Sequence, residues 1–313
     1  MRTPRLVTLT ALVVLTVLAA SGCSLKKLAV NSVAGMLAGS GGGTVFTGED
    51  DPQLVADALP FAMKLYESLL EQAPDNQELL LTTGSMFAMY ANAFLQTPAG
   101  MLPETEFERR QAMLQRAKLL YLRGRGYVLR ALELRHPGFQ ARLGAGEPDK
   151  ALAGMTPKDV PYLYWAAAAW MGAFSTNPFD MEMLLTLTRP LAVMGRAYQL
   201  EPDFNKGAIN EFYISVYGSL PVSLGGSQDK ARYHFRKAVE LAGGRTAGPY
   251  VALAASVSIP NQNAAEFREL LGSALAVDLE AGPENRLVNL LSQQKARWLL
   301  EHIEDYFLLE ETP

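Results

Sequence analysis

Two apolar segments of the chain end in the same way, on Ala131-Leu132-Glu133-Leu134-Arg135-His136-Pro137 and on Ala197-Tyr198-Gln199-Leu200-Glu201-Pro202. A small alanine lets two helices approach closely, and the proline stops one helix so that the next can begin. Ala231, Phe235 and Ala238 repeat the alanine and the aromatic residue that fills the gap between neighbouring helices. This pattern is typical of tetratricopeptide repeats, in which hairpins of two helices stack on one another.

The spacing of these alanines departs from the strict 34-residue period of a tetratricopeptide repeat. Ala197 and Ala238 are 41 residues apart, and Ala238 and Ala274 are 36 apart. The sequence therefore predicts an all-α fold of divergent tetratricopeptide-like helical hairpins with insertions. An ordinary helical bundle is the alternative that this pattern leaves open.

From Asp51 onward, apolar residues recur at spacings of three and four, and strand-like alternation is absent from the sequence pattern. This periodicity predicts ten helices, near residues 52–73, 76–96, 104–135, 160–173, 181–200, 204–217, 228–242, 249–258, 262–277 and 284–309. Residues 51–313 are thus expected to form a single helical-repeat domain.

Cys23 is the only cysteine of the 313 residues, and it follows a short apolar leader. Arg2 and Arg5 form a positive start, and the apolar run from Leu6 to Ala20 is too short to span a bilayer comfortably. This arrangement resembles a bacterial lipoprotein signal, in which the cysteine thiol receives a diacylglycerol and begins the mature chain. The alternative is a cleaved secretory signal that leaves a free or buried thiol.

The predicted organisation is therefore a signal peptide at 1–22, a lipid-anchored flexible tether at 23–50 and the helical domain at 51–313. The glycine-rich stretch 39–43 suits a tether, and Ser24 favours the periplasmic face of the outer membrane, since an aspartate there would suggest retention at the inner membrane. Removing residues 1–22 takes two of the 28 basic side chains, which leaves 26 against 32 acidic ones and a net charge of −6. Nucleic acid is consequently an unsuitable partner.

Several further segments resemble the TatT family of tetratricopeptide lipoproteins, which are associated with tripartite ATP-independent periplasmic (TRAP) transporters. The resemblance covers about residues 40–309 and follows one order along the chain. It is carried by the segment from Gly42 to Leu70, Arg123-Gly124-Arg125-Gly126-Tyr127, Tyr164-Trp165 with Trp170, Lys230-Ala231-Arg232-Tyr233-His234-Phe235, Gly248-Pro249-Tyr250, and Lys295-Ala296-Arg297-Trp298-Leu299-Leu300. The resemblance implies a homotrimer, a ligand cavity or pore, and a periplasmic solute-binding protein as partner.

A seven-residue spacing places Arg109, Arg116, Arg123 and Arg130 on one stripe of the helix predicted over 104–135. A guanidinium can hold a carboxylate ligand in a bidentate fork. The simpler interpretation is a solvated face paired with Glu104, Glu108 and Glu133. Arg123 and Arg125 are the exceptions, because Gly124 and Gly126 beside them are suited to close backbone contact, as are Ala117 and Ala131 near Gly124.

The candidate ligand-binding residues are Arg123, Arg125, Tyr127, Trp165, Trp170 and Tyr90. Arg123 and Tyr127 are four apart on one helix and share a side, and Trp165 is expected opposite them. An arginine with aromatic side chains suits an organic acid or an amphipathic molecule. Packing in the core is the alternative for the aromatic group around Trp165.

Signals for catalysis, metals and cofactors are weak. His136, His234 and His302 have no metal-ligand spacing, and Ser40 lies among glycines that no strand precedes. Glu67 and Glu71 fit a solvated helix face. We therefore expect no metal, no cofactor and no enzyme activity, and we expect a component of a TRAP transport system. A scaffold for envelope assembly that binds a peptide is the alternative function, and a hydrolase is the third.

Overall fold

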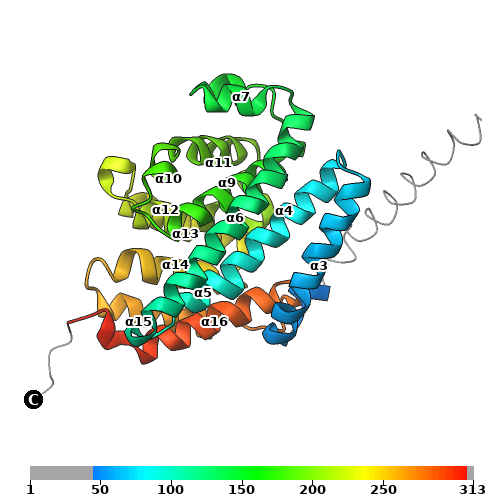
Figure 1. Ribbon diagram of the computed structural model, residues 1–313. Helices are drawn as coiled ribbons and strands as arrows, with labels where there is room; N and C mark the ends of the chain where they lie inside the picture. The colour runs from blue at the N-terminus through cyan, green and yellow to red at the C-terminus, as the bar shows by residue number, and fades with distance from the viewer. Residues whose placement is uncertain (1–44, 309–313) are drawn as a thin grey trace, which may run out of the picture.

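The computed structural model describes residues 45–308, and every regular element within that range is a helix (Figure 1). The all-α prediction is therefore confirmed. Cys23 and most of the predicted tether lie outside the described residues, as do residues 309–313.

The long helices form consecutive hairpins, in which each helix packs on its partner. One helix precedes them, α3 (Pro52–Gln72), and one follows them, α16 (Arg286–Glu301). The four hairpins are α4 (Gln77–Ala91) with α6 (Phe107–Arg135), α9 (Val160–Ser175) with α11 (Thr188–Leu200), α12 (Phe204–Ser219) with α13 (Gln228–Ala242), and α14 (Gly248–Leu253) with α15 (Ala264–Leu275).

The alanines that suggested the repeat occupy equivalent places in this arrangement. Ala131, Ala197, Ala238 and Ala274 lie on α6, α11, α13 and α15, the second helices of the four hairpins, and none is more than 2% exposed. The α6 and α11 helices end just before Pro137 and Pro202, as the sequence pattern predicts. A small residue at the helix–helix contact thus recurs once in every hairpin.

The structure differs from the predicted helices mainly in the short elements that connect the long helices. The predicted helix at 181–200 is two helices, α10 (Met181–Leu185) and α11, and the predicted helix at 284–309 ends at Glu301. Three short helices were not predicted, because each spans too few residues to show a period; they are α5 (Thr97–Ala99), α7 (Phe139–Gly144) and α8 (Pro148–Leu152). The first helices of two hairpins continue as π-helix, α4 over Asn92–Gln96 and α14 over Ala254–Ser258.

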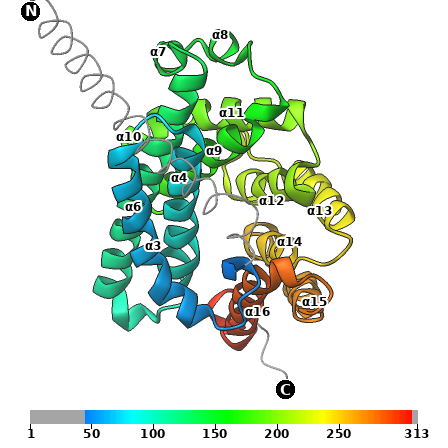
Figure 2. The same cartoon turned by 90° about the vertical axis from the view of Figure 1, so that its right-hand side faces the viewer.

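The first helices of the hairpins follow one another around a ring. In turn, α4 packs on α9, α9 on α12, α12 on α14 and α14 on α16, and α16 reaches α3, which packs on α4. Figure 2 shows this order, from α3 and α4 through α9 and α12 to α14 and α16. We call these six helices the ring helices. Their ring is closed at the contact between α16 and α3, elements at opposite ends of the described chain.

Two hydrophobic clusters hold the hairpins together, and α12 contributes to both. The larger cluster runs from α3 to α12 and includes Ile209 and Tyr213, whereas the smaller one runs from α12 to the end of α16 and includes Ile214. The α16 helix also supplies both clusters, through Leu287 in the larger and Ala296 in the smaller, so the two halves of the ring are joined through packed side chains.

Candidate functional site

Arg123 and Tyr127 on α6 both face Glu67 on α3. The Tyr127 hydroxyl donates a 2.7 Å hydrogen bond to Oε1 of Glu67, and the guanidinium of Arg123 forms an ion pair with the same oxygen. Lys64 donates to the other carboxylate oxygen at 2.6 Å. The Arg123 guanidinium also lies over the ring of Phe87, 5.0 Å from its centroid.

The environment of Glu67 keeps this carboxylate charged. Burial alone would raise the pKa of Glu67, but the hydrogen bonds from Lys64 and Tyr127 and the charge of Arg123 outweigh it and lower the pKa. Glu67 is only 8% exposed, so the expectation that it lies on a solvated face is wrong, whereas Glu71 is exposed as expected. An anion that bound Arg123 would have to compete with a carboxylate already in place.

The other arginines of the stripe on α6 lie on a solvated face, but their partners differ from those predicted. Arg109 pairs with Glu106 and Arg130 with Asp75, while Arg116 is exposed. Glu133, one of the predicted partners, instead accepts hydrogen bonds from the backbone N–H groups of Gly138 and Gln140. The sequence pattern thus identified the exposed stripe of arginines, but it did not identify partners such as Asp75, which lies outside α6.

Arg125 and Trp170 form a separate pair on the opposite flank of α6. The guanidinium of Arg125 lies 4.6 Å from the centroid of the Trp170 ring, and the Trp170 indole N–H donates to the Thr186 hydroxyl at 3.1 Å. Burial lowers the pKa of Arg125, and its Nε has no hydrogen-bond partner among the described residues. This arrangement packs α6 on α9 through a cation–π contact.

The remaining two predicted residues lie in other surroundings. Tyr90 on α4 is 8% exposed and packs against Phe94, with the ring centroids 5.6 Å apart. Trp165 on α9 packs edge-on against Tyr164 at 5.2 Å. Among the contacts described for residues 45–308, none joins Trp165 to Arg123 or Tyr127. The six predicted residues therefore do not form one cluster.

Trp165 lies beside a group of residues that the sequence did not indicate. This group lies where α9, α12 and α14 meet. We call Tyr164, Phe204, Glu211 and Gly248 the junction site. The ring of Tyr164 packs against that of Phe204 with the centroids 5.3 Å apart. Glu211, two turns further along α12, lies directly against the start of α14: a β-carbon added to Gly248 would be 2.1 Å from its Oε1. Only glycine leaves room for this carboxylate.

The electrostatics of Glu211 are unusual for a glutamate. Burial raises its pKa to about 7, and neither a hydrogen bond nor an ion pair reaches its carboxylate from the described part of the chain. Burial, followed by the nearby charge of Glu211, raises the pKa of Tyr164. Both side chains nevertheless keep intermediate exposure. Strong desolvation with partial exposure is expected of groups that face the interior of the ring rather than the outer surface.

Backbone strain lies one turn before Glu211. Asn205, Lys206 and Gly207 have φ values of 45°, 54° and 101°, so the regular part of α12 begins only after them. A non-glycine residue in this left-handed region costs roughly 1–2 kcal/mol, and such residues concentrate at functional sites. The sequence predicted an uninterrupted helix over 204–217 and gave no sign of this irregular start.

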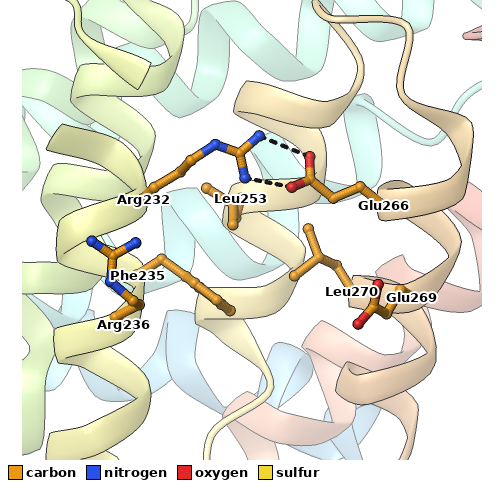
Figure 3. Close-up of a pocket in the computed structure, with 7 residues that line it drawn as sticks. All are labelled: Arg232, Phe235, Arg236, Leu253, Glu266, Glu269 and Leu270. Atoms are coloured by element: carbon orange, nitrogen blue, oxygen red, sulfur yellow. Dashed lines mark hydrogen bonds and ion pairs between the residues drawn. The ribbon is translucent and has the colours of Figure 1, made fainter. Parts of the chain in front are cut away.

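A groove of about 280 Å³ lies outside the ring, between α13 and α15. Figure 3 shows Phe235 and Leu270 reaching toward each other across it, with Leu253 between the two helices. Arg232 and Glu266 close one end with a paired guanidinium and carboxylate, and the Ser258 hydroxyl donates to Glu266 at 2.7 Å. The charges at this end are thus satisfied within the protein.

Sequence reasoning missed Glu211, since nothing in its neighbourhood along the chain marks it. Tyr164, Trp165 and Gly248 were among the segments that carry the family resemblance, but the resemblance alone did not connect them. These residues come together only in the folded structure, because residues 164, 211 and 248 lie on three different helices.

Two further observations concern metals and membranes. In residues 45–308, no group of three or more His, Cys, Asp or Glu side chains is placed to hold a metal ion. His136 instead contacts Asp159, with 3.1 Å between Nε2 and Oδ1. Across the same range, none of the helices has both the length and the apolar character needed to cross a bilayer.

Comparison with known proteins matches residues 48–307 to the family described as TRAP transporter T-component. The chain is also similar to an uncharacterised protein of Treponema pallidum (strain Nichols), with 38% identity over 303 residues that cover 92% of this chain and 94% of that protein. The family match spans the whole ring, from residue 48 before α3 to residue 307 after α16. The chain belongs to the TRAP transporter T-component family.

Proposed function

We propose that this protein is the lipid-anchored T-component of a TRAP-type transport system, held through Cys23 at the periplasmic face of the outer membrane. In this role it binds the periplasmic solute-binding protein of the transporter and a small amphipathic ligand. The family membership supports the transport role. The resemblance of residues 18–23 to a lipoprotein signal supports the anchor.

The single observation that carries the ligand role is the junction site on the ring. Glu211 and Tyr164 are desolvated yet partly exposed, and the absence of a side chain at Gly248 lets the carboxylate lie against the start of α14. Of the residues first expected to bind ligand, Trp165 adjoins this group. We assign Arg123 and Tyr127 a structural role, in which they hold α3 against α6. Arg125 and Trp170 form the contact between α6 and α9. Tyr90 packs on α4 against Phe94.

The role of the T-component is delivery: a ligand held within the ring passes to or from the solute-binding protein. The junction site offers a hydrogen-bond acceptor and aromatic surfaces, which suit the binding of a ligand. The groove between α13 and α15 is a weaker candidate for the ligand site, because its strongest polar groups, Arg232 and Glu266, already pair with each other.

The test uses the full-length lipoprotein and the solute-binding protein encoded beside it. We expect the two proteins to associate in isothermal titration calorimetry, and we expect native mass spectrometry of the protein from its host to show a co-purified small molecule. Absence of association with that solute-binding protein would contradict the transport role. A peptide-binding scaffold would instead retain peptide fragments in the same mass spectrum.

A further inference from the structure

Glu211 combines three properties that seldom occur together. Its carboxylate is strongly desolvated, it has no hydrogen-bond or ionic partner within the described residues, and it remains partly exposed. A desolvated carboxylate without a partner is destabilising, so a reason for its presence is expected. A ligand that supplies the missing partner is such a reason.

We infer that Glu211 recognises the protonated amine of an organic cation with an apolar body, held at the junction of α9, α12 and α14. This inference rests on the proposed function and names the chemical class of its ligand. The carboxylate supplies the charge, and the rings of Tyr164 and Phe204 supply the surface for the rest of the molecule.

The geometry favours an amine because each nearby group complements a cation. An ionised carboxylate only accepts hydrogen bonds, so its natural partner is an N–H donor. Tyr164 lies close enough for the charge of Glu211 to affect its pKa, and its ring packs on Phe204 and Trp165. Aromatic faces beside a carboxylate are the usual surroundings of a bound ammonium group.

The start of α14 lies against the carboxylate of Glu211. A β-carbon added at Gly248 would lie 2.1 Å from Oε1 of Glu211, so a side chain at this position would force the carboxylate to move. The left-handed residues Asn205 and Lys206 set where regular α12 begins and so fix the position of Glu211. Two independent backbone features thus place this carboxylate.

No cation of residues 45–308 forms an ion pair with Glu211. Lys295 on α16 is also partly exposed, and burial alone lowers its pKa, with no acidic group contributing. Burial alone likewise accounts for the shift of Glu211. The two groups therefore do not compensate each other. An anionic ligand at the junction site would meet Glu211 as a repelling charge, which excludes simple organic acids from this position.

The experiment compares two soluble probes of similar shape, 2-phenylethylamine and 3-phenylpropionate, by calorimetry at pH 8 on the full-length lipoprotein in nanodiscs. We expect the amine to bind and the acid to bind at least tenfold more weakly. Glu211→Gln should weaken amine binding by roughly 10- to 150-fold, the range for loss of a charge-assisted hydrogen bond. Gly248→Ala should weaken it as well, by displacing the carboxylate.

The matched control is Glu71→Gln, which removes an exposed acid on α3 and should leave amine binding unchanged. Thermal melts confirm that each variant is folded. Equal affinity for the two probes, no binding of the amine by the native chain, or full amine affinity in folded Glu211→Gln would each overturn the inference. Association of the native chain with the solute-binding protein, measured separately, shows whether the proposed function stands when the inference fails.

Discussion

Glu211 has no hydrogen-bond or ionic partner among residues 45–308, and burial raises the pKa of its carboxyl group to about 7 from its usual value of 4.5. The folded protein therefore keeps this proton to a higher pH than the unfolded chain does. Stability falls as the pH rises from about 4.5 to about 7, and the cost above that range is roughly 3 kcal/mol. Glu211 thus lowers stability at neutral pH, as expected of a residue retained for binding.

Replacing Glu211 with glutamine should therefore stabilise the protein at pH 8. We expect the free energy of unfolding to rise by about 1–3 kcal/mol at pH 8 and to change little at pH 3, where the native carboxyl is protonated in both the folded and the unfolded state. Urea denaturation at the two pH values measures the difference. A variant that is less stable than the native protein at pH 8 would show that Glu211 makes a stabilising contact.

Asp159 is the opposite case, a buried carboxylate with many partners. Arg135 donates to it at 2.7 Å, and the backbone N–H and hydroxyl of Thr156 each donate at 2.9 Å. Burial would raise its pKa, but these hydrogen bonds, with one from His136, outweigh it and hold the pKa at about 2. Its contribution of about 2 kcal/mol is present above pH 4 and is lost as the pH falls toward 2.

Asp159→Asn should accordingly lower the free energy of unfolding at pH 7 by about 2–4 kcal/mol, because Arg135 loses its buried partner. The difference between variant and native protein should shrink as the pH falls toward 2. Chemical denaturation over that range measures it. A constant difference at every pH would mean that shape, and not charge, sets the contribution of Asp159.

The residues that the sequence revealed are those whose role depends on their own helix. Ala131, Ala197, Ala238 and Ala274 could be identified as packing positions because their spacing repeats along the chain. Glu211 could not, because its pKa and its lack of a partner depend on α9 and α14. Glu67 was misplaced on the surface for the same reason, since its partners Arg123 and Tyr127 come from a helix 56 or more residues away.

At the scale of elements, the crossing of α4 and α6 depends on two facing glycines. A β-carbon on Gly124 would lie 2.6 Å from the backbone oxygen of Gly84, and one on Gly84 would lie 2.7 Å from the oxygen of Gly124. The sequence predicted this close contact at Gly124, and it is confirmed. It also suggested close contact at Gly126, which is wrong, because a β-carbon there meets nothing within 4 Å.

These two glycines of α6 form a matched pair for mutation. Gly124→Ala should destabilise the protein by about 2–4 kcal/mol, because the two backbones must separate. Gly126→Ala should stabilise it by about 0.5–1 kcal/mol, the difference in helix propensity. Thermal and urea denaturation of both variants measure the effects. Equal effects in the two would show that the contact of α4 with α6 tolerates a methyl group.

The sequence predicted the helices that are long enough to show a period, but it did not predict their irregular ends. These irregular ends are the left-handed start of α12, where Gly207 lies against Ala238 of α13, and the π-helical segments that follow α4 and α14. Such contacts join residues that are distant along the chain, so local patterns do not encode them.

At the scale of the whole molecule, attachment to the membrane is expected to depend on one sulfur atom. Cys23 is the only cysteine, and none of the helices in residues 45–308 could span a bilayer. Cys23→Ser should move the protein from the membrane fraction to the soluble fraction, and the native protein should carry an added acyl mass. A native protein without that mass, or a variant that stays in the detergent-extracted membrane, would contradict the anchor.

Trimer formation is the second prediction at this scale, and the structure changes the surface that would support it. The sequence suggested spare apolar area around Met86, Phe87, Met89, Tyr90 and Phe94. Met86, Phe87 and Tyr90 are buried inside the protomer, whereas Met89 is 39% exposed and Phe94 is half-buried. The exposed apolar side chains on α3 are Leu54, Phe61 and Leu65, at 55%, 75% and 41% exposure, and with the exposed Ala58 they follow a spacing of four, three and four.

That spacing is the one by which a helix packs along another helix. We therefore expect Phe61→Glu to convert a trimer into monomers, while Val222→Glu, at an equally exposed apolar residue in the loop before α13, leaves the trimer intact. Sedimentation equilibrium of the detergent-solubilised full-length protein at tens of micromolar decides between these outcomes. A native protein that sediments as a monomer would remove the trimer from the proposal, and a trimer that survives Phe61→Glu would place the contact on another face.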